Sequence, residues 1–192
     1  IPDFKLEKSI VNRRVKMMEE EGVEFRTGTN VGVNYSVNEL RSNFDAILLA
    51  SGCTEPRDLD VPGRNLTGIH QAMDYLPQQN RINAGEHFTS EQRISADGKK
   101  VVVIGGGDTG ADCLGTSHRQ GAATVYQFEI MPPPPVERRG DNPWPEWPII
   151  MRSSAAHEEG GIRDYNILTK SFSGREGAVE KLHAVRVHWD TD

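Results

Sequence analysis

The sequence predicts an α/β fold, and three observations support this. A run of β-branched residues at 101–104 leads directly into a glycine-rich turn and then into a segment with helical spacing. A second apolar run at 123–129 follows, which gives the order strand, helix, strand that a parallel sheet requires. Residues 165–172 and 182–189 alternate apolar and polar side chains around two glycines, which predicts an appended antiparallel hairpin or β-meander.

The first part of the chain predicts two helices and two strands. Residues 5–21 place apolar side chains at helical spacing, and Ser36 and Glu39 have the spacing of a capping box before a short helix. The alternating residues 23–26 predict a short strand. The continuous apolar run 44–50 is typical of a parallel strand covered on both faces.

Prolines and glycines mark two irregular segments. Residues 53–68 predict a crossing segment, after which 69–76 are compatible with a short helix. Seven prolines between residues 131 and 148 exclude a helix or an interior strand. We expect Trp144 and Trp147, which lie in this second segment, to pack over the sheet rather than to form an exposed partner site.

Composition narrows the class of protein. The 192 residues carry 22 Lys and Arg against 28 Asp and Glu, a net charge of −6, which argues against nucleic acid as a partner. No apolar run approaches the ~20 residues of a membrane helix, so we expect no membrane partner. The two cysteines and the scattered histidines predict neither a disulfide scaffold nor a metal site. With no signal pattern at the N-terminus, we expect a cytoplasmic segment of a longer chain.

A glycine-rich motif joins the strand at 101–104 to the helix that follows it. Gly105, Gly107 and Gly110 have G-x-G-x-x-G spacing: the first permits a tight turn, the second lets a pyrophosphate approach, and the third lets helix and strand pack closely. The helix N-terminus adds free N–H groups for phosphates. We therefore expect a Rossmann-like domain whose cofactor-binding turn consists of Gly105, Gly106, Gly107, Asp108, Thr109 and Gly110.

The choice between NADH and NADPH depends on charges beyond the second strand. Glu129 ends that strand, where a carboxylate can accept hydrogen bonds from both ribose hydroxyls, and this favours NADH. Arg138 and Arg139 follow nearby in sequence and could bind a 2′-phosphate instead. The sequence therefore leaves the coenzyme open as NAD(P)H.

Several stretches together resemble the small (β) subunit of glutamate synthase. The resemblance rests on residues 101–113, 115–121, 142–145, 168–172 and 185–189. Residues 1–8, 45–52 and 56–63 are also similar to parts of that family's flavin domain. The resemblance implies that residues 1–64 are a partial FAD-domain remnant with a crossing segment, and that 65–192 are the NAD(P)-binding domain. It also implies that the strand end at Ala50, Ser51 and Gly52 contributes to the FAD site.

The family resemblance implies an NAD(P)H-dependent flavin oxidoreductase. In such an enzyme NAD(P)H passes hydride to FAD, and iron–sulfur clusters carry the electrons to a large (alpha) subunit that makes glutamate from glutamine and 2-oxoglutarate. The family's first glycine motif and its cysteine clusters are absent here. FAD and the iron–sulfur clusters are therefore expected in the full-length protein only, and this segment alone is not expected to be competent.

Two other functions remain open at the level of sequence. The same modules occur in other two-domain flavin oxidoreductases, of the pyrimidine or ferredoxin reductase type. A non-catalytic nucleotide-sensing module would also keep the glycine turn. In every enzyme of this kind the nicotinamide and the flavin carry the chemistry, so we assign no catalytic side chain.

Overall fold

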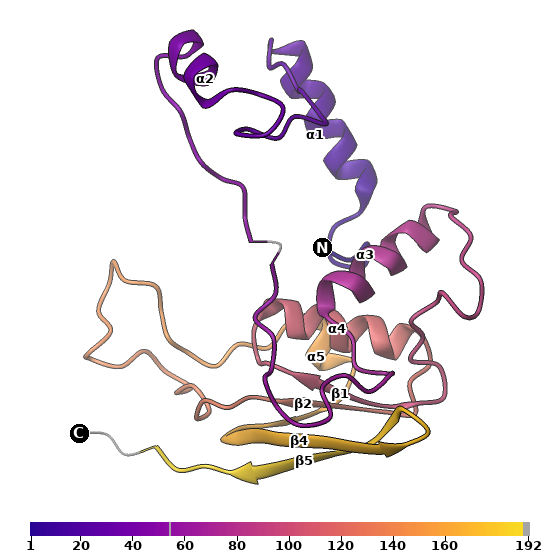
Figure 1. Ribbon diagram of the computed structural model, residues 1–192. Helices are drawn as coiled ribbons and strands as arrows, with labels where there is room; N and C mark the ends of the chain where they lie inside the picture. The colour runs from indigo at the N-terminus through magenta and orange to yellow at the C-terminus, as the bar shows by residue number, and fades with distance from the viewer. Residues whose placement is uncertain (54, 190–192) are drawn as a thin grey trace. The chain divides into compact units, whose positions relative to one another are not determined.

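The computed structural model describes residues 1–53 and 55–189, and these form two compact units (Figure 1). The smaller unit is Asp3–Glu55, and the larger comprises Ile1–Pro2 with Pro56–Asp192. Each unit is described by itself below. Among the described residues, no helix has the length and apolar character needed to cross a membrane.

The smaller unit contains the two helices that the sequence predicts. Helix α1 spans Lys8–Glu20, and Gly22 follows it with a φ of 96°, which only glycine adopts readily. Helix α2 spans Val37–Asn43, and the backbone N–H of Asn38 donates to the Ser36 hydroxyl at 3.2 Å. Ser36 is therefore the N-cap that its position in the sequence suggests.

The two strands expected in the smaller unit are not formed, so both predictions are wrong. Residues 23–26 and 44–50 have no regular structure, and the side chains of Leu48 and Leu49 are 90% and 87% exposed. A strand needs hydrogen bonds from a neighbouring strand, and no described residue pairs with either segment. An apolar run shows that a segment can be buried in a sheet, but it cannot supply the neighbouring strands.

The larger unit is built on a three-stranded parallel sheet. Strands β1 (Lys100–Ile104), β2 (Thr124–Phe128) and β3 (Ile162–Asp164) lie in the order β1-β2-β3. Helix α4 (Asp108–Arg119) connects β1 to β2, and the short helix α5 (Ala155–Glu158) precedes β3. This succession of parallel strands and helices is the mononucleotide-binding half of a dinucleotide fold. The predicted α/β class is therefore confirmed.

The core of the larger unit lies between α4, the sheet and α3 (Ala72–Asn83). Leu114 of α4 and Val125 of β2 are completely buried, because they occupy the facing sides of the helix and the sheet. Tyr75 and Leu76 of α3 pack with Cys113 of α4 in a second cluster. Helix α3 continues through a proline at position 77, so it is longer than the sequence suggests.

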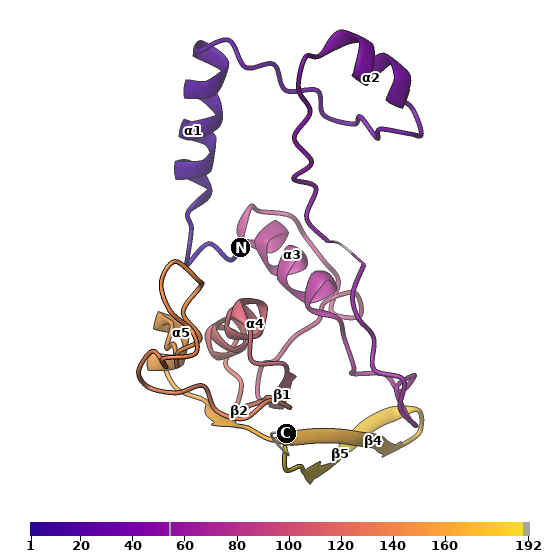
Figure 2. The same cartoon turned by 90° about the vertical axis from the view of Figure 1, so that its left-hand side faces the viewer.

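The C-terminal strands form the predicted antiparallel hairpin. Strands β4 (Ile167–Arg175) and β5 (Ala178–Arg186) are joined by Glu176 and Gly177, both with positive φ, as in the tight turns that match strand twist. Figures 1 and 2 show the hairpin on the side of the parallel sheet opposite α4. The crossing segment is bonded to it, since Thr67 donates its N–H to Gly177 and accepts from Val179.

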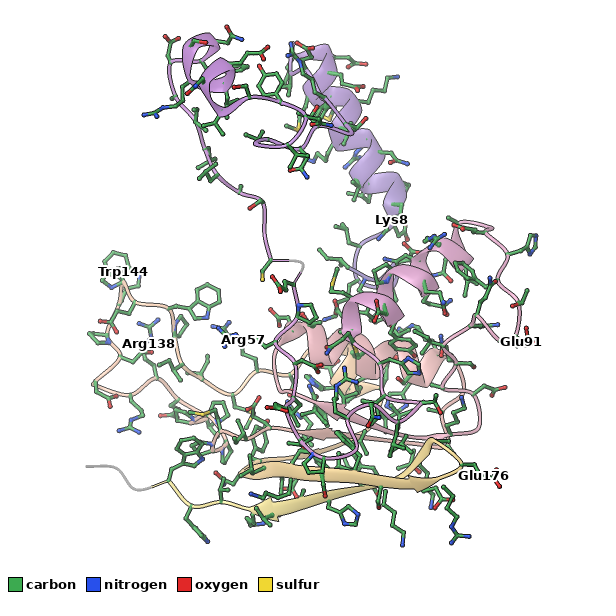
Figure 3. The ribbon with its side chains drawn as sticks, viewed as in Figure 1. Lys8, Arg57, Glu91, Arg138, Trp144 and Glu176 are labelled. Atoms are coloured by element: carbon green, nitrogen blue, oxygen red, sulfur yellow. The ribbon has the colours of Figure 1, made fainter. Side chains whose placement is uncertain are left out.

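The proline-rich loop closes on itself instead of covering the sheet. The buried side chain of Asn142 donates to Glu146 Oε2 and to the Trp147 carbonyl, both at 3.1 Å, and accepts from the N–H of Ile149 at 2.8 Å. Trp144 and Trp147 are 84% and 75% exposed, and Figure 3 shows Trp144 at the outer tip of the loop. The expectation that both rings pack over the sheet is therefore wrong.

Candidate functional site

The candidate site begins at the turn that follows β1. The N–H of Gly105 donates to the Phe128 carbonyl at 2.8 Å, which extends the pairing of β1 with β2 by one residue. Gly105 has a φ of 120°, a conformation that residues with a Cβ rarely adopt. The glycine at this position is therefore required by the backbone, and the chain can turn sharply from strand into helix.

The turn leaves open space in front of the N-terminus of α4. Gly107 is the N-cap residue, and a Cβ built on it would meet no atom within 4 Å. Asp108 and Thr109 follow as the first helical residues, and both are exposed. The free N–H groups and the positive dipole end of the helix therefore face a space where a phosphate could lie.

The third glycine of the motif has a different surrounding. A Cβ built on Gly110 would collide with the Gly105 carbonyl oxygen and would lie 2.6 Å from Gln127 Nε2. Helix α4 thus approaches β1 and β2 so closely that only glycine fits. The structure brings Gly105 and Gly110 together, as the motif requires.

Glu129 reaches the glycine turn from the end of β2. Its Oε2 accepts the N–H of Gly106 at 2.6 Å, and its Oε1 accepts the N–H of Met131 at 3.0 Å. Two backbone donors thus hold the carboxylate beside the turn. Each carboxylate oxygen can accept more than one hydrogen bond, so both remain able to accept a ribose hydroxyl.

Strand β3 adds residues that the sequence did not reveal. A small hollow is lined by residues of the glycine turn, of β2 and its end, and of β3 and its end: Gly106, Gln127, Glu129, Arg163, Asp164 and Tyr165. Arg186 of β5 donates to Asp164, and this hydrogen bond lowers the pKa of the Asp164 carboxyl below its usual value. A three-residue strand carries too little pattern to be recognised from sequence, so its contribution to the site was missed.

The two arginines considered for a 2′-phosphate are bound within their own loop. Arg138 donates to the carbonyls of Asn142 and Glu146, both at 3.3 Å. Arg139 pairs with Asp141 at 2.9 Å. Both guanidinium groups are therefore engaged within the proline-rich loop.

The expected flavin contacts do not belong to this site. Ala50, Ser51 and Gly52 lie in the smaller unit, where all three are exposed and Gly52 has a φ of 68°. The six residues of the glycine turn and Glu129 all lie in the larger unit. In the described part of the chain, no three His, Cys, Asp or Glu side chains are grouped so that they could hold a metal ion.

Comparison with known proteins places this geometry in a family. The family model for pyridine nucleotide-disulphide oxidoreductases matches residues 4–141. A glutamate synthase (NADPH) small chain of Mycobacterium tuberculosis is 54% identical over 190 residues, which cover 97% of this chain and 39% of the relative. A glutamate synthase (NADH) of Saccharomyces cerevisiae is 46% identical over 198 residues, covering 98% of this chain and 9% of the relative.

A solved structure supports the fold alone. A mutant of FprA from Mycobacterium tuberculosis aligns with the whole of this chain and with 54% of its own chain, at a TM-score of 0.65 and 19% identity.

The present chain spans about two fifths of the length of the mycobacterial glutamate synthase small chain. The resemblance noted from the sequence is thus confirmed as similarity over nearly the whole segment. The chain belongs to the pyridine nucleotide-disulphide oxidoreductase family.

Proposed function

We propose that this chain is the NAD(P)H-binding region of a glutamate synthase small subunit. In the whole enzyme it would bind NAD(P)H and deliver hydride to FAD, for the synthesis of glutamate from glutamine and 2-oxoglutarate. The observation that carries the proposal is the contact between the Gly106 N–H and the Glu129 carboxylate. It joins the two features, a glycine turn and an acidic strand end, that dinucleotide binding requires.

The residues of the turn fit a dinucleotide. The pyrophosphate would lie in the open space before Gly107, where the N-terminus of α4 offers N–H groups and favourable charge. The adenine ribose would lie against Glu129, whose carboxylate is already oriented by two backbone donors. The bound nicotinamide supplies the hydride, and the protein holds and orients it.

The remaining parts of the proposal concern the longer protein. We assign residues 65–192 to the NAD(P)H-binding domain and residues 1–64 to a flavin-domain remnant with its crossing segment. Ala50, Ser51 and Gly52 would contribute to the FAD site once the unpaired segment 44–50 has neighbouring strands. Iron–sulfur clusters, the large (alpha) subunit as partner and a cytoplasmic location are proposed from the similarity to glutamate synthase small chains.

Calorimetric titration with NADH and with NADPH tests the proposal. The protein should bind at least one coenzyme, and Gly107→Val should weaken binding on the order of tenfold or more by filling the phosphate space. Gly140→Val is the matched control, because a Cβ there also meets nothing and the residue lies in the proline-rich loop. Absence of binding to both coenzymes, or equal affinity of the Gly107→Val variant, would contradict the proposal.

A further inference from the structure

A chain of hydrogen bonds connects the glycine turn to α5. Gln127 of β2 donates from Nε2 to the Gly105 carbonyl at 2.9 Å, and its Oε1 lies 2.8 Å from His157 Nε2. His157 Nδ1 lies 3.1 Å from the backbone N of Ser154 and 3.2 Å from its hydroxyl. Hydrogen bonds thus connect Ser154, at the start of α5, through His157 and Gln127 to Gly105, the first glycine of the turn.

The donor and the acceptor of each of these hydrogen bonds are determined by the backbone groups at the two ends of the series, the Ser154 N–H and the Gly105 carbonyl. A backbone N–H can only donate, so His157 Nδ1 must accept from Ser154, and the ring proton of the neutral histidine is on Nε2. That proton is donated to Gln127 Oε1. The Gln127 amide nitrogen then faces the Gly105 carbonyl, which can only accept. No other orientation of the Gln127 amide satisfies both neighbours.

Gln127 is a buried polar residue, and its burial needs a reason. Its side chain is 2% exposed on the face of β2 that packs against α4, where Val125 is apolar. A buried amide without partners is costly, so an apolar residue would be the simpler choice for packing. The amide occupies the space that a side chain at Gly110 would need, 2.6 Å from a Cβ there. The third glycine of the motif therefore makes room for this hydrogen bond.

The hydrogen bond from Gln127 acts on the peptide whose N–H donates to Glu129. The Gly105 carbonyl and the Gly106 N–H belong to one planar peptide and point in opposite directions. Gln127 holds the carbonyl, while the N–H points to Glu129 at 2.6 Å. Rotation of this peptide would turn the N–H away from the ribose-binding carboxylate. By holding the Gly105 carbonyl, Gln127 therefore sets the direction of the Gly106 N–H.

We propose that Gln127 and His157 are positioning residues for the dinucleotide turn. His157, oriented by Ser154 at the start of α5, fixes the Gln127 amide, and the amide fixes the Gly105–Gly106 peptide in the conformation that receives the coenzyme. This inference rests on the proposed NAD(P)H site for its functional consequence. The His157 ring is half-buried and bonded on both nitrogens, so it does not lie on a solvated face.

Two substitutions of His157 separate positioning from simple capping of α5. In His157→Asn the shorter amide can replace Nδ1 and accept from Ser154, but it does not reach Gln127. In His157→Gln the longer amide can replace Nε2 and donate to Gln127, but it loses the bond to Ser154. His183→Asn is the matched control, because His183 also bonds a serine, Ser173, but lies on the hairpin.

The first measurement is the affinity for NADH or NADPH, whichever binds. We expect His157→Asn to weaken binding roughly fivefold, the effect of one lost hydrogen bond. His157→Gln should weaken binding less than His157→Asn, because it keeps the hydrogen bond to Gln127. His183→Asn should bind like the unmodified protein. Gln127→Met should weaken binding as His157→Asn does, and the double variant should be no worse than Gln127→Met, because both changes break one chain. Equal affinities of the Asn and Gln variants at position 157, or additive effects in the double variant, would overturn the proposal.

The second measurement needs no coenzyme, so it separates this proposal from the proposed function. Hydrogen exchange of the peptide covering residues 104–111 should be faster in His157→Asn than in His157→Gln, which keeps the hydrogen bond to Gln127. If the protein binds neither coenzyme but the exchange differs as stated, the function is wrong and the positioning chain stands. Identical exchange in both variants would show that His157 does not control the turn.

Discussion

The Glu129 carboxylate accepts the Gly106 N–H at 2.6 Å, so the acidic end of β2 touches the glycine turn that ends β1. Gly106 and Glu129 lie far apart in sequence, and the parallel pairing of β1 with β2 brings them together. A Cβ on Gly106 would also lie 2.6 Å from this carboxylate. The G-x-G-x-x-G motif does not require a glycine at position 106. A side chain there would collide with the Glu129 carboxylate, and this explains Gly106.

The position of Glu129 predicts a preference for NADH. Two like charges about 4 Å apart repel by about 1 kcal/mol in water and by about 4 kcal/mol near a protein surface, so a 2′-phosphate would bind at least several-fold more weakly. Calorimetry should show tighter binding of NADH, since Arg138 and Arg139 are engaged in their own loop. Glu129→Gln keeps an acceptor for Gly106 and should narrow the difference.

The matched control for the coenzyme prediction is Glu137→Gln, at an exposed carboxylate of the proline-rich loop. This variant should leave the ratio of NADH to NADPH affinity unchanged. Tighter binding of NADPH to the unmodified protein, together with no effect of Glu129→Gln, would show that Glu129 does not lie beside the ribose.

The sequence predicted the parts of the fold whose interactions are local or follow a recognised motif. The strand at 101–104, the turn with Gly105 and Gly110, and helix α4 are confirmed, because spacing and composition there reflect contacts within one strand–turn–helix unit. The C-terminal hairpin is confirmed for the same reason, since its alternating pattern and its turn lie next to each other in sequence.

The failures concern residues whose structure depends on distant partners. The run 44–50 has the composition of a buried strand, but no described segment pairs with it. Gln127 and His157 gave no signal, because their bonds join β2, α5 and the turn across the fold. A polar residue at an inward-facing position of a predicted strand is the one clue that could have identified Gln127.

Gly110→Ala is expected to destabilise the protein. Its Cβ would collide with the Gly105 carbonyl and press on Gln127, and overpacking of this kind costs about 1–3 kcal/mol. Alanine gains about 1 kcal/mol over glycine within a helix, so the net loss should be smaller than the collision alone suggests. Urea unfolding measures the change, with Gly140→Ala as the control in open space. A more stable Gly110→Ala variant would show that α4 lies farther from β1.

The two cysteines should differ sharply in reactivity. Burial raises the pKa of the Cys113 thiol to about 12, so at pH 8 only about one molecule in ten thousand carries the reactive thiolate. Cys53 is exposed. A disulfide reagent should therefore modify one thiol per folded chain and two in denaturant, and Cys53→Ser should leave the folded protein unreactive. Rapid modification of both thiols in the folded protein would contradict the burial of Cys113 behind α3.

The ion pair between Asp164 and Arg186 predicts how stability changes in acid. Asp164 ends β3 beside the candidate site, and Arg186 of β5 donates to its carboxylate at 2.8 Å and 3.2 Å, so the pair ties the hairpin to the parallel sheet. The hydrogen bond from Arg186 lowers the pKa of Asp164 in the folded state. The stabilisation is therefore complete above the unfolded pKa of about 3.9 and is lost as the pH falls through the lower pKa of the folded state.

Arg186→Gln should reduce the urea midpoint at pH 7, and the difference from the unmodified protein should shrink below pH ~4. Arg175→Gln removes a more exposed arginine, 3.5 Å from Glu180 within the same hairpin, and should change the midpoint little at either pH. A constant difference between Arg186→Gln and the unmodified protein from pH 7 to acid would show that the Arg186 side chain stabilises the hairpin through packing and not through the Asp164 carboxylate.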